Sequence, residues 1–169
     1  MNEIITKQLI LKKVQENHLQ QIFEIWTDSE ACKYMFDSHW SNVDELYVVL
    51  EEDDEYFCFA AFMPDGNDIV ATCRISLEGD NGEWDLGYNV HKAFWGKGFA
   101  TEMVQALLTF GRESLGVTTV VAFVAKANIA SCKVLEKCGF EIVDESSFTK
   151  KGTDTVFPTY EYRLEIKNV

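Results

Sequence analysis

The sequence predicts an α+β fold with a strand–helix–strand unit at its centre. Three observations lead to this class. Short apolar runs bounded by turn residues fill much of the first half, which is typical of strands joined in hairpins. From Gly98 onward, apolar residues recur at three- and four-residue steps, which is typical of an amphipathic helix. The continuous apolar run Val117–Ala125 then predicts a strand buried on both faces.

The N-terminal third predicts one strand and two helices. Thr6–Val14 has the composition of an opening strand, and Asn17 is a candidate N-cap for the first helix. That helix is indicated by apolar residues at helical spacing, namely Leu19, Ile22, Phe23 and Trp26. A second helix is expected after Asn42, with Val43, Leu46, Val49 and Leu50 on one side. These elements precede the part of the sheet that is easiest to recognise.

A hairpin and a further strand follow. Tyr56–Met63 and Ile69–Leu77 are two apolar runs, separated by a turn whose residues are Pro, Asp, Gly and Asn. A glycine-containing turn then leads into Glu83–Val90, which alternates as a strand does.

The C-terminal half begins with the amphipathic helix, expected from Gly98 to about Ser114. After the buried strand, Asn128 is the N-cap expected for another helix, and Gly139 is the residue expected to end it. Two closing strands, Phe140–Phe148 and Thr159–Ile166, are predicted around a loop at Gly152–Pro158. The sequence contains no repeat, low-complexity tract or linker, so a single domain over residues 1–169 is expected.

Composition narrows the class of protein. Hydrophobic residues make up 47% and aromatic residues 13%, as in globular domains. The longest apolar runs are too short to cross a membrane, and the N-terminus lacks the pattern of a secretion signal. An odd number of cysteines, five, without a C-x-x-C pair predicts buried thiols in the reducing cytoplasm. These are Cys32, Cys58, Cys73, Cys132 and Cys138.

Charge is distributed unevenly along the chain. The net charge of −13 argues against nucleic acid as a partner, because binding phosphate backbones requires clustered Lys and Arg. Residues 91–140 nevertheless hold six basic and three acidic side chains and so carry +3, which leaves −16 for the remainder. This segment is expected to attract an anion, unless the excess is a chance of composition.

The segment Gly96-Lys97-Gly98 stands directly before the amphipathic helix. Glycine disfavours helices, but it permits tight turns and lets a ligand approach bare backbone. A glycine-rich turn at a helix start presents free N–H groups and a partial positive charge, both of which favour phosphate. The P-loop pattern G-x-x-x-x-G-K-[ST] and the dinucleotide pattern G-x-G-x-x-G are both absent, which disfavours a nucleotide-binding module.

Two motifs together identify a family. The segments LGYNV (Leu86–Val90) and WGKGFATE (Trp95–Glu102), followed by N-x-x-S-x-x-x-L-E-K-C-G-F from Asn128, resemble the GNAT family of acyl-CoA-dependent N-acetyltransferases. The similarity is to its RimJ/RimL-type branch, which acts on ribosomal-protein N-termini and, in relatives, on small amines. The family pattern Gln/Arg-x-x-Gly-x-Gly/Ala falls on Trp95–Ala100, and Trp95 departs from it at the first position.

The resemblance implies a GNAT fold, with a central mixed, mostly antiparallel twisted sheet of six to seven strands flanked by about four helices. It implies acetyl-CoA as cosubstrate and no metal. The Val90 backbone would pair with the pantetheine arm, Asn128 would contact the same arm while also serving as N-cap, and backbone amides would hold the pyrophosphate. The residues implied around the pyrophosphate are Trp95, Gly96, Lys97, Gly98, Phe99, Ala100 and Thr101.

Candidate catalytic residues follow from the chemistry of amine acetylation. Attack on a thioester requires a proton acceptor for the amine, and by family likeness Asp85 stands near a common acidic position. Glu83 lies on the same strand face, and an ordered water is a third possible base. Ser131 matches a position that the family implies for protonating the leaving thiolate, although it could be an ordinary residue of a first helical turn. Other polar candidates have simpler explanations: Cys132 and Cys138 as packing residues, His39 and His91 as polar surface.

The expected function is therefore transfer of an acetyl group from acetyl-CoA to a primary amine, either a peptide N-terminal α-amine or a small amine or polyamine. The alternative is a non-catalytic acyl-CoA-binding or sensor domain. The acceptor pocket is expected among Asp28–Trp40 and Lys151–Pro158, whose aromatic and acidic residues suit a cation. No membrane partner is expected, and both a monomer and a homodimer remain open.

Overall fold

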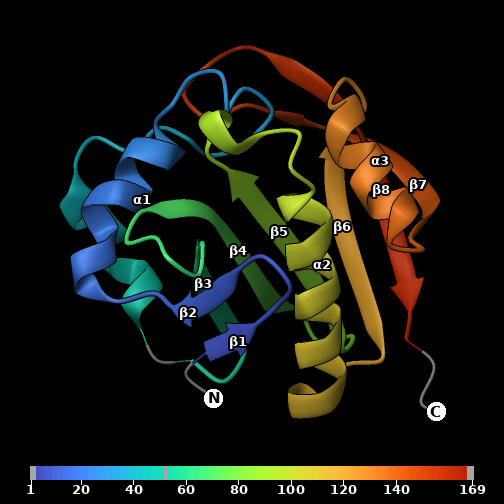
Figure 1. The fold of residues 1–169 in the computed structure, drawn as a ribbon. Helices are drawn as coiled ribbons and strands as arrows, with labels where there is room; N and C mark the ends of the chain where they lie inside the picture. The colour runs from blue at the N-terminus through green and yellow to red at the C-terminus, as the bar shows by residue number, and fades with distance from the viewer. Residues whose placement is uncertain (1–2, 52, 167–169) are drawn as a thin grey trace.

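A computed structural model describes residues 3–51 and 53–166 of the chain, and within these it contains one eight-stranded sheet (Figure 1). The strand order is β1-β2-β3-β4-β5-β6-β8-β7, and every neighbouring pair is antiparallel except the parallel pair β5–β6. The strands are β1 (Glu3–Ile5), β2 (Ile10–Lys13), β3 (Tyr56–Phe62), β4 (Ile69–Glu78), β5 (Glu83–Val90), β6 (Thr119–Ala125), β7 (Glu141–Thr149) and β8 (Val156–Glu165). The expected α+β class and mixed, mostly antiparallel sheet are confirmed.

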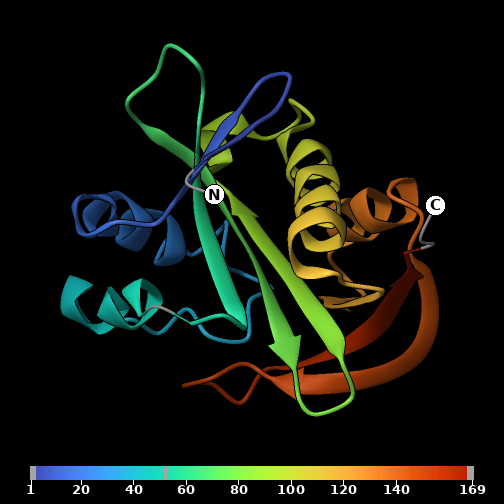
Figure 2. The same cartoon turned by 90° about the horizontal axis from the view of Figure 1, so that it is seen from below.

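Helices cover both faces of the sheet, as Figure 2 shows in a view along it. One face carries α1 (Leu19–Trp26) and the 3-10 helix η2 (Val43–Leu50), and the other carries α2 (Phe99–Phe110) and α3 (Ile129–Lys137). Strand β3 shows why two cores form: Phe59 and Ala61 are buried toward α2, whereas Cys58 and Ala60 belong to the core beneath α1. The alternation of β3 therefore supplies apolar surface to both layers.

The N-terminal segment differs from the expected single strand. Thr6–Val14 is interrupted by a turn at Thr6–Leu9, in which the Thr6 hydroxyl donates to the Leu9 carbonyl at 2.9 Å, so β1 and β2 form a hairpin. This additional strand is one reason that the sheet has eight strands instead of six to seven. Asn17 is not the N-cap of the first helix, because it lies inside a 3-10 turn over Glu16–His18 that has Gln15 at its N-cap. Helix α1 begins after this turn, at Leu19, with His18 in its N-cap position.

Element boundaries in the C-terminal half follow the sequence closely, with two shifts. Helix α2 ends at Phe110 and continues as a π-helical turn over Gly111–Leu115, so the expected helix to about Ser114 changes type in its last turn. Asn128 is the N-cap of α3, and Gly139 follows it with φ of +91°. Strand β8 begins at Val156, so Pro158 lies inside a strand and not in the preceding loop.

The pairing between β5 and β6 is short, and it positions the site. Their register includes only Trp84 with Val120 and Asp85 with Val121. Beyond those pairs the two strands separate, although β5 stays paired with β4 and β6 with β8. The sheet is therefore open between the C-terminal halves of β5 and β6. In the described parts of the chain, no helix is long and apolar enough to cross a membrane.

Candidate active site

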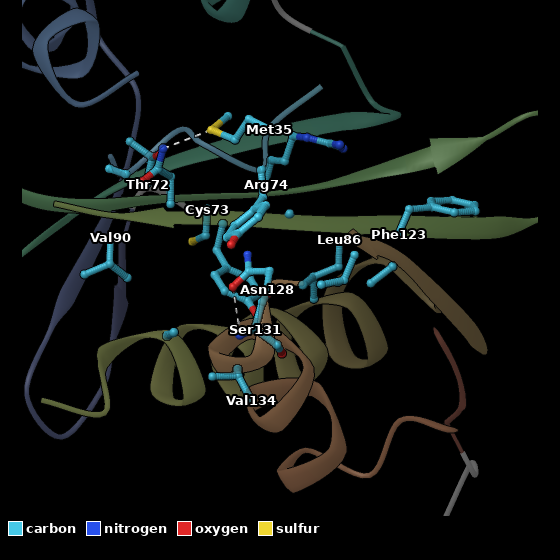
Figure 3. Close-up of a pocket in the computed structure, with 18 of the residues that line it drawn as sticks. Met35, Thr72, Cys73, Arg74, Leu86, Val90, Phe123, Asn128, Ser131 and Val134 are labelled. Carbon is cyan, nitrogen blue, oxygen red and sulfur yellow. Dashed lines mark hydrogen bonds between the residues drawn. The ribbon is translucent and has the colours of Figure 1, made fainter. Parts of the chain in front are cut away.

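A cavity of about 1420 Å³ passes through the opening between β5 and β6. Its walls include Leu86–Val90 from β5 and Ala122–Ala125 from β6, which are the parts of these strands that do not pair with each other. Figure 3 shows Met35, Thr72 and Arg74 on one side of the central strands and Asn128, Ser131 and Val134 on the other. The cavity therefore connects the two faces of the sheet.

One end of the cavity is a loop of bare backbone. Gly96 and Gly98 have φ of +74° and +81°, a left-handed conformation that L side chains rarely adopt, and a Cβ built on either would have no atom within 4 Å. The first N–H groups of any helix lack intrahelical acceptors, and Gly98, the N-cap of the twelve-residue helix α2, has no side chain to cap them. Open space, free amides and the helix dipole together fit a phosphate group.

Phe99 and Lys97 contribute to this loop in different ways. The Phe99 ring is buried in the core and stacks on Phe94 with centroids 6.3 Å apart, so only its backbone is available to a ligand. Lys97 is exposed, lines the cavity and has no ion-pair partner among the residues that the structure describes. Ala100 and Thr101 line the same end.

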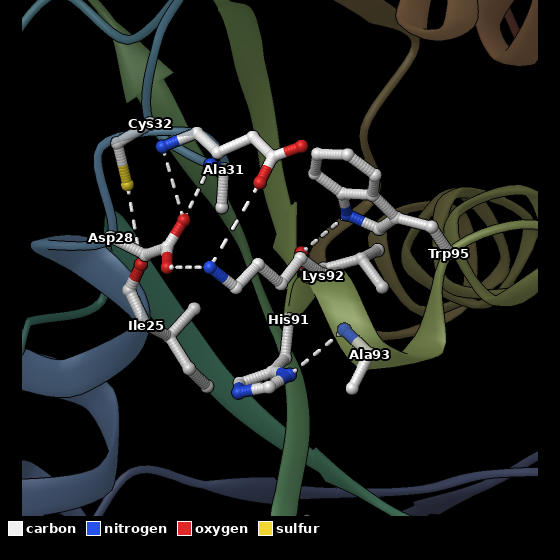
Figure 4. A network of polar contacts seen from close by, with 10 residues as sticks. Ile25, Asp28, Ala31, Cys32, His91, Lys92, Ala93 and Trp95 are labelled. Atoms are coloured by element: carbon white, nitrogen blue, oxygen red, sulfur yellow. Dashed lines mark hydrogen bonds and ion pairs between the residues drawn. The ribbon is translucent and has the colours of Figure 1, made fainter.

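Trp95, which departs from the family pattern, ties the loop to strand β5. Its indole N–H donates to the Val90 carbonyl at 2.8 Å, and the side chain remains 49% exposed beside the cavity (Figure 4). One lone pair of the Val90 carbonyl is therefore already used, which leaves the second for a ligand. Trp95 thus fixes the position of the glycine loop relative to the strand that the resemblance implies for the pantetheine arm.

A polar network holds the other wall near the same strand end. Lys92 Nζ lies 2.9 Å from Asp28 Oδ2, and the Asp28 carboxylate also accepts the backbone N–H groups of Glu30 and Ala31 (Figure 4). The bond from Lys92, followed by that from Ala31, lowers the pKa of Asp28 below its usual value. This contact connects the Asp28–Trp40 segment to the residues after β5.

Asp85 is buried on the face of β5 that looks toward α1, and only 7% of it is exposed. Its Oδ2 lies 2.5 Å from Nη2 of Arg74, a cavity residue for which sequence reasoning made no prediction. Burial raises the pKa of Asp85, and the Arg74 guanidinium opposes that rise without cancelling it. A single arginine in the apolar strand Ile69–Glu78 was the available signal, since a cation placed among apolar residues is favoured by a carboxylate partner.

Gly87 gives space to Arg74. A Cβ at Gly87 would lie 3.3 Å from Nε of that arginine, and the β4–β5 register is regular on both sides of it. The strand therefore has no bulge at Gly87, and the glycine itself lines the cavity. It lets the guanidinium cross the strand and reach Asp85.

Glu83 lies outside the cavity wall. Its Oε1 is 2.5 Å from Nη2 of Arg163 on β8, so it connects β5 to the far part of the sheet. Of the two acids on this strand, Asp85 is the one that lines the cavity.

Asn128 and Ser131 lie together at the start of α3. The Asn128 side-chain oxygen accepts the Ser131 N–H at 3.3 Å, which confirms the expected N-cap. The Ser131 Oγ lies 2.6 Å from the hydroxyl of Tyr88, and both residues line the cavity. Sequence reasoning did not single out Tyr88, although strand alternation places it with Leu86 on the face toward α2 and α3.

The opposite end of the cavity is aromatic and acidic. The Asp28–Trp40 segment lines it as expected, but Lys151–Pro158 does not, and Ser146–Phe148 and Thr159 occupy that side. Lys151 instead binds the segment from outside, with Nζ 2.7 Å from Asp37 Oδ2. The aromatic residues that line this end include Trp26, Tyr34, Phe36, Trp40, Tyr56, Phe123 and Phe148, and the acidic ones besides Asp85 are Glu30, Asp37, Glu51 and Asp53.

The remaining candidates lie away from the chemistry. Cys132 is buried in the main core, and burial raises the pKa of the Cys138 thiol, which disfavours its reactive thiolate form. His91 accepts the Ala93 N–H through Nδ1, and the His39 ring lies against Gly152. Neither histidine lines the cavity. Among the described residues, no three His, Cys, Asp or Glu side chains gather as a metal site would require.

This fold and site define a class of acyltransferases, and comparison with known proteins gives the family. Residues 8–141 match the acetyltransferase (GNAT) domain, so the chain belongs to the GNAT family and is a GNAT N-acetyltransferase. A curated relative is an uncharacterized N-acetyltransferase p20 of Bacillus licheniformis, 26% identical in an alignment of 148 positions that covers 83% of this chain and 83% of that one. The resemblance drawn from the two motifs is confirmed.

Solved structures share the fold. A spermidine N-acetyltransferase from Vibrio cholerae, in complex with CoA and spermine, has a TM-score of 0.82 at 18% identity, covering 94% of this chain and 95% of that chain. RimL, a ribosomal L7/L12 α-N-protein acetyltransferase in complex with coenzyme A, has a TM-score of 0.81 at 16% identity, covering 98% of each. Similar folds thus occur in enzymes named for quite different amine acceptors.

Proposed function

We propose that residues 1–169 act as a single catalytic domain that moves the acetyl group of acetyl-CoA to a primary amine by direct attack on the thioester. The observation that carries this proposal is the cavity through the sheet, which joins a loop of bare amides on one face to an acidic, aromatic chamber on the other. A donor with phosphates and an acceptor with an amine can thereby meet between β5 and β6.

The cofactor end is assigned to the glycine loop and its surroundings. The backbone from Gly96 to Thr101 would hold the pyrophosphate, with Lys97 adding charge at the rim, as their geometry favours. Val90 on β5 and Asn128 at the start of α3 would contact the pantetheine arm. Acetyl-CoA supplies the activated acetyl group, and the protein supplies its position.

Asp85 is the candidate base. An amine acceptor is mostly protonated near neutral pH, so a proton must leave before or during attack on the carbonyl carbon. The raised pKa of Asp85 makes it a better proton acceptor than an ordinary aspartate, and it lines the cavity beneath the β5–β6 opening. Arg74 limits its basicity, so transfer through an ordered water and a role for Glu83 remain alternatives.

The acceptor is proposed to be a peptide N-terminal α-amine or a small amine such as a polyamine. Four acids line the acceptor end besides the Asp85–Arg74 pair, and aromatic rings accompany them, which suits a cation. The fold relatives named for spermidine and for a ribosomal protein N-terminus act on acceptors of these two kinds. A cytoplasmic location agrees with five free cysteines, and monomer and homodimer are both compatible with the site.

A thiol-release assay tests the proposal. The protein with acetyl-CoA is offered polyamines, aminoglycosides, small amines and N-terminal peptides, and release of CoA thiol is followed for each. Acetylation of at least one amine, identified by mass spectrometry, is expected. CoA binding without turnover of any amine in a broad panel would favour a sensor role and contradict the proposal. Light scattering with and without CoA decides the oligomeric state.

A further inference from the structure

Tyr88 forms a hydroxyl pair with Ser131 in the wall of the cavity. The two oxygens are 2.6 Å apart, which is short for an O–H···O bond, and they come from different elements, β5 and α3. Among the described residues, Tyr88 is the only hydrogen-bond partner of the Ser131 Oγ. The contact joins the strand that borders the opening to the helix that carries the candidate acid.

The direction of this bond decides what Ser131 can do. A hydroxyl has one proton to donate, and a phenol is a stronger donor than an aliphatic alcohol because it is the stronger acid. The other arrangement would leave Tyr88 to donate to the Ser131 carbonyl, at a longer 3.4 Å. Donation from Tyr88 to the Ser131 Oγ is therefore favoured, and it leaves the serine proton free to point into the cavity.

We propose that Tyr88 is a positioning residue for the transfer reaction, because its hydroxyl holds Ser131 with the serine proton directed at the leaving sulfur. This inference rests on the proposed function. When the amine nitrogen bonds to the acetyl carbon and the C–S bond breaks, the electron pair goes to sulfur. The Ser131 hydroxyl donates a hydrogen bond to that thiolate. The amine's proton passes to the base and then to water, and the thiolate leaves to be protonated by water.

Tyr88 stabilises the thiolate without giving up its own proton. Burial raises the pKa of Tyr88 to about 12, whereas a free thiol has a pKa near 8.5. Proton transfer from the phenol to the thiolate would be unfavourable by roughly three orders of magnitude. The pair therefore functions as a relayed hydrogen bond, in which the phenol strengthens the serine as a donor.

The test measures the thiol pKa of bound CoA, which needs no acceptor amine. Thiolate absorbance is titrated in complexes with CoA, and identical complexes with desulfo-CoA are subtracted so that the protein's tyrosines cancel. Ser131→Ala is expected to raise the thiol acid-dissociation pKa by about one unit, tenfold in equilibrium constant, as loss of a hydrogen bond to a charged atom predicts. Tyr88→Phe is also expected to raise the thiol pKa, so that the acid-dissociation constant falls at least about threefold.

The two residues should act as one unit. The double variant should match Ser131→Ala alone, because Tyr88 acts through the serine. Ser131→Thr, which keeps the hydroxyl, should retain most of the effect. Desulfo-CoA affinity should be the same in Tyr88→Phe and wild type, which a merely structural role would not preserve. Tyr47→Phe removes an exposed hydroxyl that binds Glu16 at 2.7 Å outside the cavity, and it should leave the thiol pKa unchanged.

Each outcome has a distinct meaning. Wild-type protein with no affinity for CoA would contradict the proposed function, and this inference with it. A thiol pKa that is equal in wild type and CoA-binding Tyr88→Phe, or effects that simply add in the double variant, would overturn the role of Tyr88 alone. If Tyr88→Phe fails to bind CoA, fluorotyrosine at position 88 replaces it. That stronger donor should lower the thiol pKa further, and no change would also overturn the inference.

Discussion

The glycine loop before α2 depends on backbone conformations that other residues rarely adopt. Gly98 has φ of +81° at the N-cap, and valine there would add both strain and two methyl groups on the side open to a ligand. We expect Gly98→Val to weaken CoA binding at least about tenfold, on the order of 1.4 kcal/mol, measured by calorimetry.

The matched control for that variant is Gly82→Val. Gly82 also has positive φ, +76°, with no atom within 4 Å of a built Cβ, but it lies in the β4–β5 turn and not in the cavity wall. It carries the same backbone strain without the ligand contact. Equal CoA affinity in wild type and folded Gly98→Val would refute the assignment of the phosphate loop.

The proposed role of Asp85 as the base leads to a second prediction about a single side chain. Asp85→Asn should keep acetyl-CoA binding while lowering turnover roughly 10²-fold or more, because the amine loses its proton acceptor. In wild type, activity should rise as pH rises through the pKa of Asp85, which burial places above the usual value of about 3.9. This rise of activity with pH should be absent in Asp85→Asn, and much of the lost rate should return at high pH.

Glu83→Gln provides the comparison for Asp85→Asn. Both substitutions remove the carboxylate partner of an arginine, Arg163 in one case and Arg74 in the other, so both are checked for folding by urea titration. A rate loss confined to Glu83→Gln would transfer the base role to that residue. An increase in the amine KM alone in Asp85→Asn would instead identify a counter-charge for a cationic acceptor.

Single residues also mark the limit of what the sequence could predict about the site. The N-cap of α3 is a local feature, so Asn128 could be predicted from its neighbours, whereas the role of Gly96 and Gly98 is predicted only together with the family motifs. The partners of Asp85 and Ser131 are not local, since Arg74 comes from β4 and Tyr88 from β5. Finding them requires the strand register and the packing of α3, which propensities do not contain.

Helix α3 is fixed at its start by a side chain that also borders the cavity. Asn128→Ala should destabilise the fold by about 0.5–2 kcal/mol, since the Ser131 N–H would lose its acceptor. Urea denaturation measures this change. Asn42→Ala is the control, because Asn42 occupies the N-cap of η2 without any side-chain capping bond and should cost much less. Equal losses from the two variants would mean that the Asn128 cap contributes nothing specific.

Strands were predicted well where an apolar run or an alternating pattern is long, as in β3, β4 and β5. The prediction of one strand over Thr6–Val14 was wrong because Thr6–Leu9 is a tight turn that contains neither glycine nor proline. No typical turn residue therefore interrupts the apolar pattern. The position of this turn depends on contacts from far along the chain: the Gln8 side-chain amide donates to Glu102 Oε2 at 2.8 Å, and the Gln8 N–H donates to Oε1 at 2.6 Å. Tertiary contacts decide such turns, and the sequence gives no local sign of them.

The uneven charge of the whole chain predicts that CoA affinity depends on salt. If the segment of residues 91–140 attracts the cofactor, CoA affinity should fall as salt is added, because exposed charges are screened beyond about 10 Å at 0.1 M ionic strength. Lys97→Gln should flatten this dependence, since Lys97 lines the cavity without an ion-pair partner in the described residues. Lys133→Gln, which lies outside the cavity wall, should do so less.

Lys137→Gln is the control for those two variants, because Lys137 lies at the opposite end of α3 from Asn128. It should leave the salt dependence of CoA binding unchanged. Binding by wild type that is the same at low and high salt would mean that backbone amides suffice and that the uneven charge is incidental.

The separation of β5 from β6 has a consequence for the molecule as a whole. An open sheet has two outer edges, here β1 and β7, but this sheet has two further edges inside it, where Leu86–Val90 faces Ala122–Ala125. Unpaired strand edges are templates to which extended chains add. On the proposed function, the amide-containing arm of the cofactor takes the place of a strand between β5 and β6. It competes with any other extended polypeptide for the backbone hydrogen bonds of these edges. Bound acyl-CoA is therefore expected to slow aggregation of the protein by covering these inner edges.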